Sequence, residues 1–184
     1  MCLSGLQVPR AHWNSNPMEL SVLNDFDQTA FTEALADIFE HSPWIPSETW
    51  KAGPFSSIND LHEKLCQTLD GSSDDQKLEL IQAHPDLAGK LAVSGELTEF
   101  STNEQQSAQL DKLTHDQFER ISDLNERYKE KFQFPFIICI KEHTHASIFE
   151  HFEVRVNHDT KTELAAALHQ ICRIAWHRLN DLIQ

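Results

Sequence analysis

The sequence is poor in basic residues and in glycine and has no long apolar run, and each shortage argues against a class of protein. Five glycines among 184 residues argue against collagen-like and low-complexity sequence. Fifteen Lys and Arg against 29 Asp and Glu give a formal net charge of -14, which disfavours nucleic acid and anionic membranes as partners. The longest strongly apolar run, Phe134 to Ile140, is far shorter than the roughly 20 residues of a transmembrane helix. We therefore expect a globular protein with no nucleic acid and no membrane partner.

The cysteines and the chain ends show no pattern of a disulfide framework, a metal site or a targeting sequence. None of the four cysteines forms a C-x-x-C pair, so we expect neither disulfides nor a thiolate metal site. The N-terminus does not place a charged segment before an apolar one, and the C-terminal DLIQ is not a peroxisomal tripeptide. These patterns predict a cytoplasmic protein.

The length predicts one folded domain, which we place at residues 18–184. Residues 1–17 mix Pro, Gly, Asn and Ser without hydrophobic periodicity, so we expect them to form a flexible N-terminal arm. The sequence leaves both Met1 and Met18 open as the natural start.

Apolar residues recur at helical spacing along the domain, which predicts an all-α, single-domain helical bundle. The helices are expected at 27–41, 57–70, 74–83, 114–132, 144–152 and 160–182. Asp27 is the expected N-cap of the first, Ser57 opens the second, and Thr114 and Thr160 begin capping boxes. The Pro- and Trp-rich segment 42–55 should be an ordered connection with only a short turn of helix. A buried extended connector is expected near 134–140, because no second strong strand candidate could pair with this run. Its backbone groups would need partners, which a polar ligand could supply.

One of the eleven histidines has a distinctive position. His84 precedes Pro85, which disfavours helical geometry at His84 and favours a helix over 85–90. The positive end of that helix dipole would leave the imidazole neutral and able to exchange a proton with a ligand. The alternative is that His84 only caps the helix and packs.

The run Ser101-Thr102-Asn103-Glu104-Gln105 has the form of a capping box. Glu104 would then bond only to the backbone of Ser101. The alternative is a polar pocket floor for an anionic or ureido-bearing ligand at a helix N-terminus. Sequence spacing does not choose between the two.

Arg178 lies near the end of the last expected helix. It could be a surface cation that complements the helix dipole, with Asp181 as its partner. Alternatively, its planar guanidinium could bind a carboxylate in a bidentate manner.

A metal site would use Glu142, His143 and His145, with Glu150 and His151 nearby. The chain has no H-E-x-x-H motif, so we expect no metal. Two rival functions remain: a metal hydrolase built on His143, His145 and His151, and a non-catalytic acidic helical module that binds a partner.

Several longer blocks resemble one known family, the 2-oxo-4-hydroxy-4-carboxy-5-ureidoimidazoline (OHCU) decarboxylases of purine catabolism. The blocks are FEHSPWIPS (39–47), GPF (53–55), LIQAHPDLAGK (80–90), GELTEFSTNEQ (95–105), LNERYKEKFQFPFIICIKEHTHASI (124–148) and RIAWHRL (173–179). They occur in family order, and the similarity runs from about Met18 to the C-terminus. The resemblance implies an all-α fold of its own type, a homodimer, and no metal or organic cofactor. It also implies loss of CO2 from OHCU and protonation on one face to give (S)-allantoin.

The resemblance also implies which residues form the site. The catalytic residues would be His84, Glu104 and Arg178, with Arg173 as the nearby competitor for the arginine. The substrate-binding positions would be Pro85, Ser101, Thr102, Asn103, Glu104, Gln105, Phe136, Ile137, Ile138, Cys139 and Ile140. Gln133 and Glu142 stand where the family usually has Gly, and a side chain would resist a positive φ there.

Overall fold

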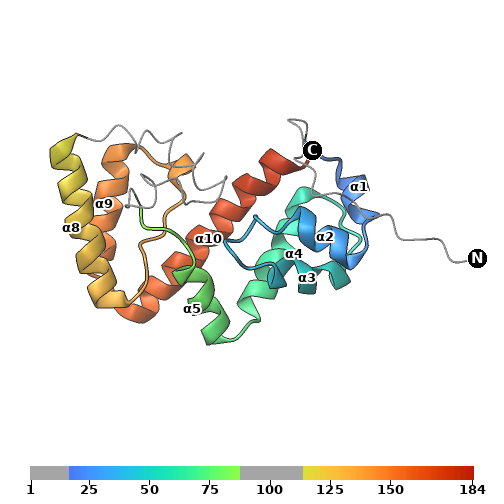
Figure 1. Ribbon diagram of the computed structural model, residues 1–184, viewed down its shortest axis with the longest axis horizontal. Helices are drawn as coiled ribbons and strands as arrows, with labels where there is room; N and C mark the ends of the chain where they lie inside the picture. The colour runs from blue at the N-terminus through green and yellow to red at the C-terminus, as the bar shows by residue number, and fades with distance from the viewer. Residues whose placement is uncertain (1–16, 88–113) are drawn as a thin grey trace, which may run out of the picture.

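The computed structural model describes residues 17–87 and 114–184 (Figure 1). Its α-helices are α1 (Leu20–Asn24), α2 (Gln28–Ala34), α3 (Trp44–Thr49), α4 (Ile58–Asp70), α5 (Asp74–Gln82), α8 (His115–Phe132), α9 (His145–Arg155) and α10 (Thr160–Leu182). Two short 3-10 helices, η1 (Trp50–Ala52) and η3 (Ile140–Glu142), complete the set. Within these ranges the β-structure is limited to an isolated bridge between Met18 and Ile183. The all-α fold expected from the sequence is confirmed.

The helix α10 organises the molecule. It runs from the α8 and α9 pair at one end to the α1–α4 region at the other (Figure 1) and packs against α4 and α5. Its apolar face buries Ile171, Ala175 and Leu179, because these residues recur every four positions. None of the helices in the described ranges has both the length and the apolar character needed to cross a membrane.

Most helices begin at the capping residues that the sequence predicts. Ser57 caps α4 and Thr114 forms a capping box at α8, as expected. Ser73, expected only as part of a helix break, also forms a capping box, at α5. The capping box expected at Thr160 is wrong: Asp159 caps α10 by accepting the Thr162 N–H, and Thr160 is the first helical residue. Aspartate is a strong N-cap, so the capping residue of α10 lies one position before the expected Thr160.

The region 28–52 differs from expectation. Asp27 caps α2 as predicted, but the helix ends at Ala34, and the chain reaches His41 through turns that still bury Leu35, Ile38 and Phe39. The connection at 42–55 holds more than a short turn, since α3 is followed directly by η1. Pro46 is tolerated because it lies in the first turn of α3, where an N–H has no helical acceptor.

The expected connector is present and buried. Residues 134–140 are all buried, and the stretch up to η3 is neither helix nor strand. Tyr128 packs against the aromatic rings around it, which anchor the start of the connector: Phe132, Phe134, Phe136 and Phe152. Gln133 adopts the left-handed conformation (φ 63°) after α8, and its amide donates to the carbonyls of Lys129 and Glu130. The side chain thus offsets the strain that a glycine would avoid.

Candidate active site

His84 follows the C-terminal end of α5 and is 8 % exposed. Its Nδ1 lies 2.8 Å from the carbonyl oxygen of Leu80. Because a carbonyl can only accept, Nδ1 carries the hydrogen, and the neutral ring keeps a lone pair on Nε2. The local fold therefore selects one tautomer and makes Nε2 the atom that can take a proton.

Burial is the main cause of the lowered pKa of His84, which falls to about 4. The Glu40 carboxylate and the Leu80 carbonyl oppose this fall, whereas Arg178 and His41 add to it. The sequence predicts a neutral imidazole for a different reason, the N-terminus of a following helix. The structure instead places the ring at the C-terminal end of α5, and Pro85 and Asp86 are not helical. Desolvation thus replaces the helix dipole as the cause.

Arg178 lies on α10 and is 1 % exposed. Its Nη1 donates to the Asp37 carbonyl oxygen at 2.9 Å and to Oε2 of Glu40 at 3.1 Å. The surface-cation alternative is wrong, since Arg178 is buried and Asp181 pairs with Lys141. Arg178 is therefore close enough to His84 to lower its pKa.

The competing arginine, Arg173, has a different environment. It is half-exposed and pairs with Glu142, which also accepts from Nε2 of His177 at 2.8 Å. The Arg173 guanidinium lowers the pKa of the Glu142 carboxyl. The structure thus brings Arg178, and not Arg173, into the cluster around His84.

Sequence reasoning did not single out Glu40, which is 2 % exposed. Its carboxylate binds Arg178 and acts electrostatically on His84, so it links the two residues. The one signal was its place inside the FEHSPWIPS block, directly after the buried Ile38 and Phe39. A buried carboxylate needs a charged partner, and the partner is distant in sequence.

Hydrogen bonds link the connector region to α5 and α10. The carbonyl of Gln133, directly before the connector, accepts from the amide of Gln82 at 3.0 Å, and Gln82 lies two residues before His84 in sequence. At its far end the Cys139 N–H donates to Oε1 of Gln170 on α10 at 2.8 Å. Cys139 also shares a group of neighbouring side chains with His177, the residue before Arg178. The predicted substrate-binding positions at 136–140 thus follow a residue that contacts α5 and include one that contacts α10.

The remaining predicted site residues fall outside the described ranges. They are Ser101, Thr102, Asn103, Glu104 and Gln105. The choice between a capping box and a pocket floor at Glu104 therefore stays open.

The structure does not bring together the residues of the rival metal site around His143. The His143 and His151 rings lie 4.7 Å apart, and burial followed by the His151 charge lowers the pKa of His143. Among the described residues, the group with ligand atoms close enough for one ion is Cys139, Glu142 and His177, with atoms within 4.8 Å of one another. There Glu142 already accepts from Arg173. The structure thus offers no support for a hydrolase centre on His143, His145 and His151.

Comparison with known proteins shows which sequences this chain is similar to. The sequence pattern of the OHCU decarboxylase family matches residues 24–180. The chain is 39% identical over 160 residues to the 2-oxo-4-hydroxy-4-carboxy-5-ureidoimidazoline decarboxylase of Halalkalicoccus jeotgali, covering 87% of this chain and 89% of that one. It is 36% identical over 164 residues to the enzyme of the same name from Haloferax volcanii, covering 89% and 95%.

A solved structure shares the fold. The crystal structure of (S)-allantoin synthase superposes with a TM-score of 0.74 at 28% identity over 91% of this chain. The match spans 54% of that longer chain. From the family pattern, the two relatives and the shared fold, we conclude that this chain belongs to the OHCU decarboxylase family.

Proposed function

We propose that this protein is a carboxy-lyase of urate degradation that decarboxylates OHCU and releases allantoin as the (S) enantiomer. The observation that carries the proposal is the family match over residues 24–180, with relatives of that name aligned over most of their length. The buried cluster of His84, Glu40 and Arg178 supports it, because it combines a neutral base with a fixed positive charge.

The chemistry asks the protein for orientation and proton transfer. The bond between the hydroxyl-bearing ring carbon and its carboxylate breaks as CO2 leaves, and its electron pair forms a C=C bond to the carbon that bears the ureido group. The electron pair of the former C=N bond moves onto the ring nitrogen, which takes up a proton. The neighbouring hydroxyl becomes a carbonyl when it loses its proton. A proton added to the carbon that bears the ureido group sets the configuration. The ring itself accepts the electrons, so binding geometry and acid–base groups carry the catalysis.

His84 is the proposed acid–base residue. Its Nε2 holds the lone pair that would accept the hydroxyl proton, because Nδ1–H is bonded to Leu80. The Glu40 carboxylate favours the imidazolium that forms, as its raising effect on the pKa of His84 indicates. Arg178 would compensate the anionic charge of the substrate.

The other proposed contacts rest on the resemblance. Glu104 and Gln105 would hold the ureido and ring N–H groups, with Ser101, Thr102 and Asn103 beside them. Main-chain groups at 136–140 would decide which face of the ring receives the proton. The burial of this segment and its hydrogen bond to Gln170 on α10 support that role.

The test is to generate OHCU in place with uricase and hydroxyisourate hydrolase, add the protein, and follow circular dichroism as allantoin forms. We expect rapid formation of (S)-allantoin, unchanged by a chelator. Racemic allantoin at the rate of the blank would contradict the proposal and favour the non-catalytic binding module. Loss of activity with a chelator would favour a metal enzyme.

We also infer that the protein is a cytoplasmic homodimer, and the family resemblance supports the dimer. Light scattering of the purified protein tests it: a mass near twice 21.1 kDa is expected, and a mass near 21.1 kDa at micromolar concentration contradicts it.

A further inference from the structure

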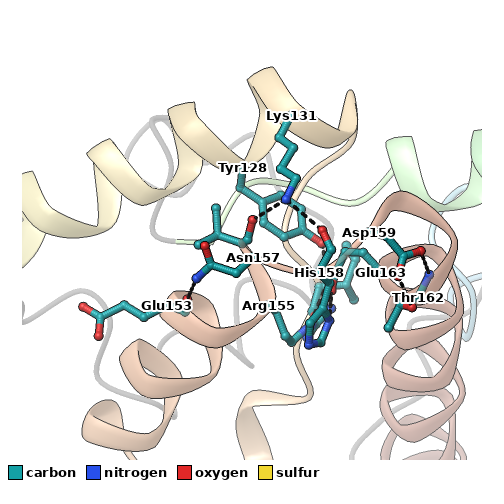
Figure 2. A network of polar contacts seen from close by, with 11 residues as sticks. Tyr128, Lys131, Glu153, Arg155, Asn157, His158, Asp159, Thr162 and Glu163 are labelled. Carbon is teal, nitrogen blue, oxygen red and sulfur yellow. Dashed lines mark hydrogen bonds and ion pairs between the residues drawn. The ribbon is translucent and has the colours of Figure 1, made fainter.

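A buried carboxylate joins the helices α8, α9 and α10 beside the connector. Glu163, in the first turn of α10, is fully buried and accepts from Nε and Nη2 of Arg155 at 2.9 and 2.6 Å (Figure 2). The Tyr128 hydroxyl on α8 donates to the same oxygen, and Nδ1 of His158 lies 2.9 Å from the other. The proposed chemistry uses none of these four residues.

Arg155 turns a further edge of its guanidinium to the connector. Its Nη1 donates to the carbonyl oxygen of Ile137 at 2.7 Å, and its Cζ lies 4.4 Å from the centre of the Phe136 ring. The other anchor is Gln170, which binds the Cys139 N–H at 2.8 Å. Two side chains, one from α9 and one from α10, therefore hold the carbonyl of one residue and the N–H two residues on.

This spacing has a consequence for the residue in between. In an extended chain, the N–H and C=O groups of two residues that are two positions apart point to the same side. The N–H and C=O of the residue between them point to the opposite side. The backbone of Ile138 makes no hydrogen bond to any residue in the described ranges, although Ile138 is only 5 % exposed. Buried peptide groups are nearly always paired, so this N–H and C=O are groups that a bound ligand can pair.

We propose that Arg155, held by Glu163, and Gln170 are positioning residues that fix the backbone of residues 137–139 so that Ile138 presents its peptide groups to the substrate. The inference rests on the proposed function and assigns a role to residues outside the site. The planar guanidinium of Arg155 suits this positioning role, because one edge binds the Glu163 carboxylate while another binds the Ile137 carbonyl. An ammonium group cannot make both contacts in the same geometry. Stability alone is a weak reason for such a pair, since buried ion pairs are often replaceable by apolar residues without loss.

The test compares Arg155→Lys and Gln170→Leu with a matched control, Arg120→Lys. Arg120 also pairs with a glutamate, Glu153, and also lies over an aromatic ring, but it is half-exposed and does not contact the connector. Two quantities are measured for each protein: KM for OHCU generated in place, and the Kd and stoichiometry of (S)-allantoin by calorimetry. If a variant is only partly unfolded, its apparent kcat and binding stoichiometry fall, because fewer molecules are active. Its KM and Kd stay unchanged, because the folded molecules bind as before.

Both connector variants should raise KM and Kd by about tenfold, because a misplaced binding group weakens every contact it makes, and Arg120→Lys should match the wild type. Gln170→Leu removes no buried charge, so it keeps the test valid if Arg155→Lys fails to fold. Wild-type KM and Kd in a folded Gln170→Leu protein would overturn the inference. A wild-type protein that makes no (S)-allantoin would instead contradict the proposed function, and the inference would fall with it.

Discussion

At the scale of single residues, the pKa of His84 determines how activity should depend on pH. Burial lowers this pKa from 6.5 to about 4, so the ring is neutral throughout the range from roughly pH 6 to 8. If the neutral form accepts the proton, kcat/KM should be flat over that range and should fall only as the pH approaches the lowered pKa. A steady-state pH profile measures this. An inflection near pH 6.5 would show that His84 titrates like an exposed histidine and would contradict the assignment.

Glu40 should matter for both stability and activity. Glu40→Gln removes the carboxylate that pairs with the buried Arg178, which should destabilise the protein by about 3 kcal/mol and lower kcat/KM. Urea unfolding and steady-state kinetics at a temperature where the variant is folded measure the two effects.

Glu142→Gln is the matched control for Glu40→Gln. It breaks the partly exposed pair with Arg173, which should cost less than about 1 kcal/mol and leave kcat/KM near wild type. If Glu142→Gln lowered kcat/KM more than Glu40→Gln, Arg173 rather than Arg178 would be the arginine that binds the substrate.

At the scale of elements, the start of a helix was easier to predict than its end. Capping side chains act within three residues, so Asp27, Ser57 and Thr114 marked the starts of their helices correctly. The end of α2 at Ala34 was missed, because Leu35 and the turns after it are held by burial in the core, which local spacing does not contain. The apolar pattern continues past Ala34 although the helix does not.

The end of α8 gives a prediction about Gln133. Its left-handed backbone favours glycine, and its side-chain amide compensates by capping two carbonyls. Gln133→Gly should therefore be more stable than Gln133→Ala by about 1 kcal/mol, because alanine loses the cap and keeps the strain. Thermal or urea unfolding of the two variants measures the difference. Equal stabilities would show that this turn carries no strain.

At the scale of the whole molecule, the sequence predicted the all-α fold, and two of its predicted site residues lie close together in the structure. The blocks around His84 and Arg178 marked both residues, and the structure brings them together. Glu40 could not be placed, because its partner lies 138 residues away in sequence and only the packing of α10 brings them into contact. The cause of the neutral imidazole was missed for the same reason: burial is a property of the whole fold, whereas a helix dipole is local.

The ends of the folded domain are tied to each other, which bears on residues 1–17. The Met18 N–H donates to the carbonyl of Leu182 at 2.8 Å, and the Gln184 N–H donates to that of Met18 at 2.9 Å. We propose that the domain begins at Met18, so a chain that starts there should keep the wild-type Tm and kcat/KM. A chain that starts at Ser21 loses this contact and should melt at a lower temperature. Loss of activity in the first variant would give the N-terminal residues a part in the site.

The most direct test of the central claim compares the wild type with His84→Ala at equal concentrations of folded protein. OHCU is generated in place, and circular dichroism follows the sign and rate of the allantoin signal. The account predicts rapid formation of (S)-allantoin by the wild type and slow racemic allantoin, at the rate of the blank, with His84→Ala. Wild-type turnover by the variant would contradict the assignment of His84, and racemic product from both proteins would contradict the decarboxylase itself.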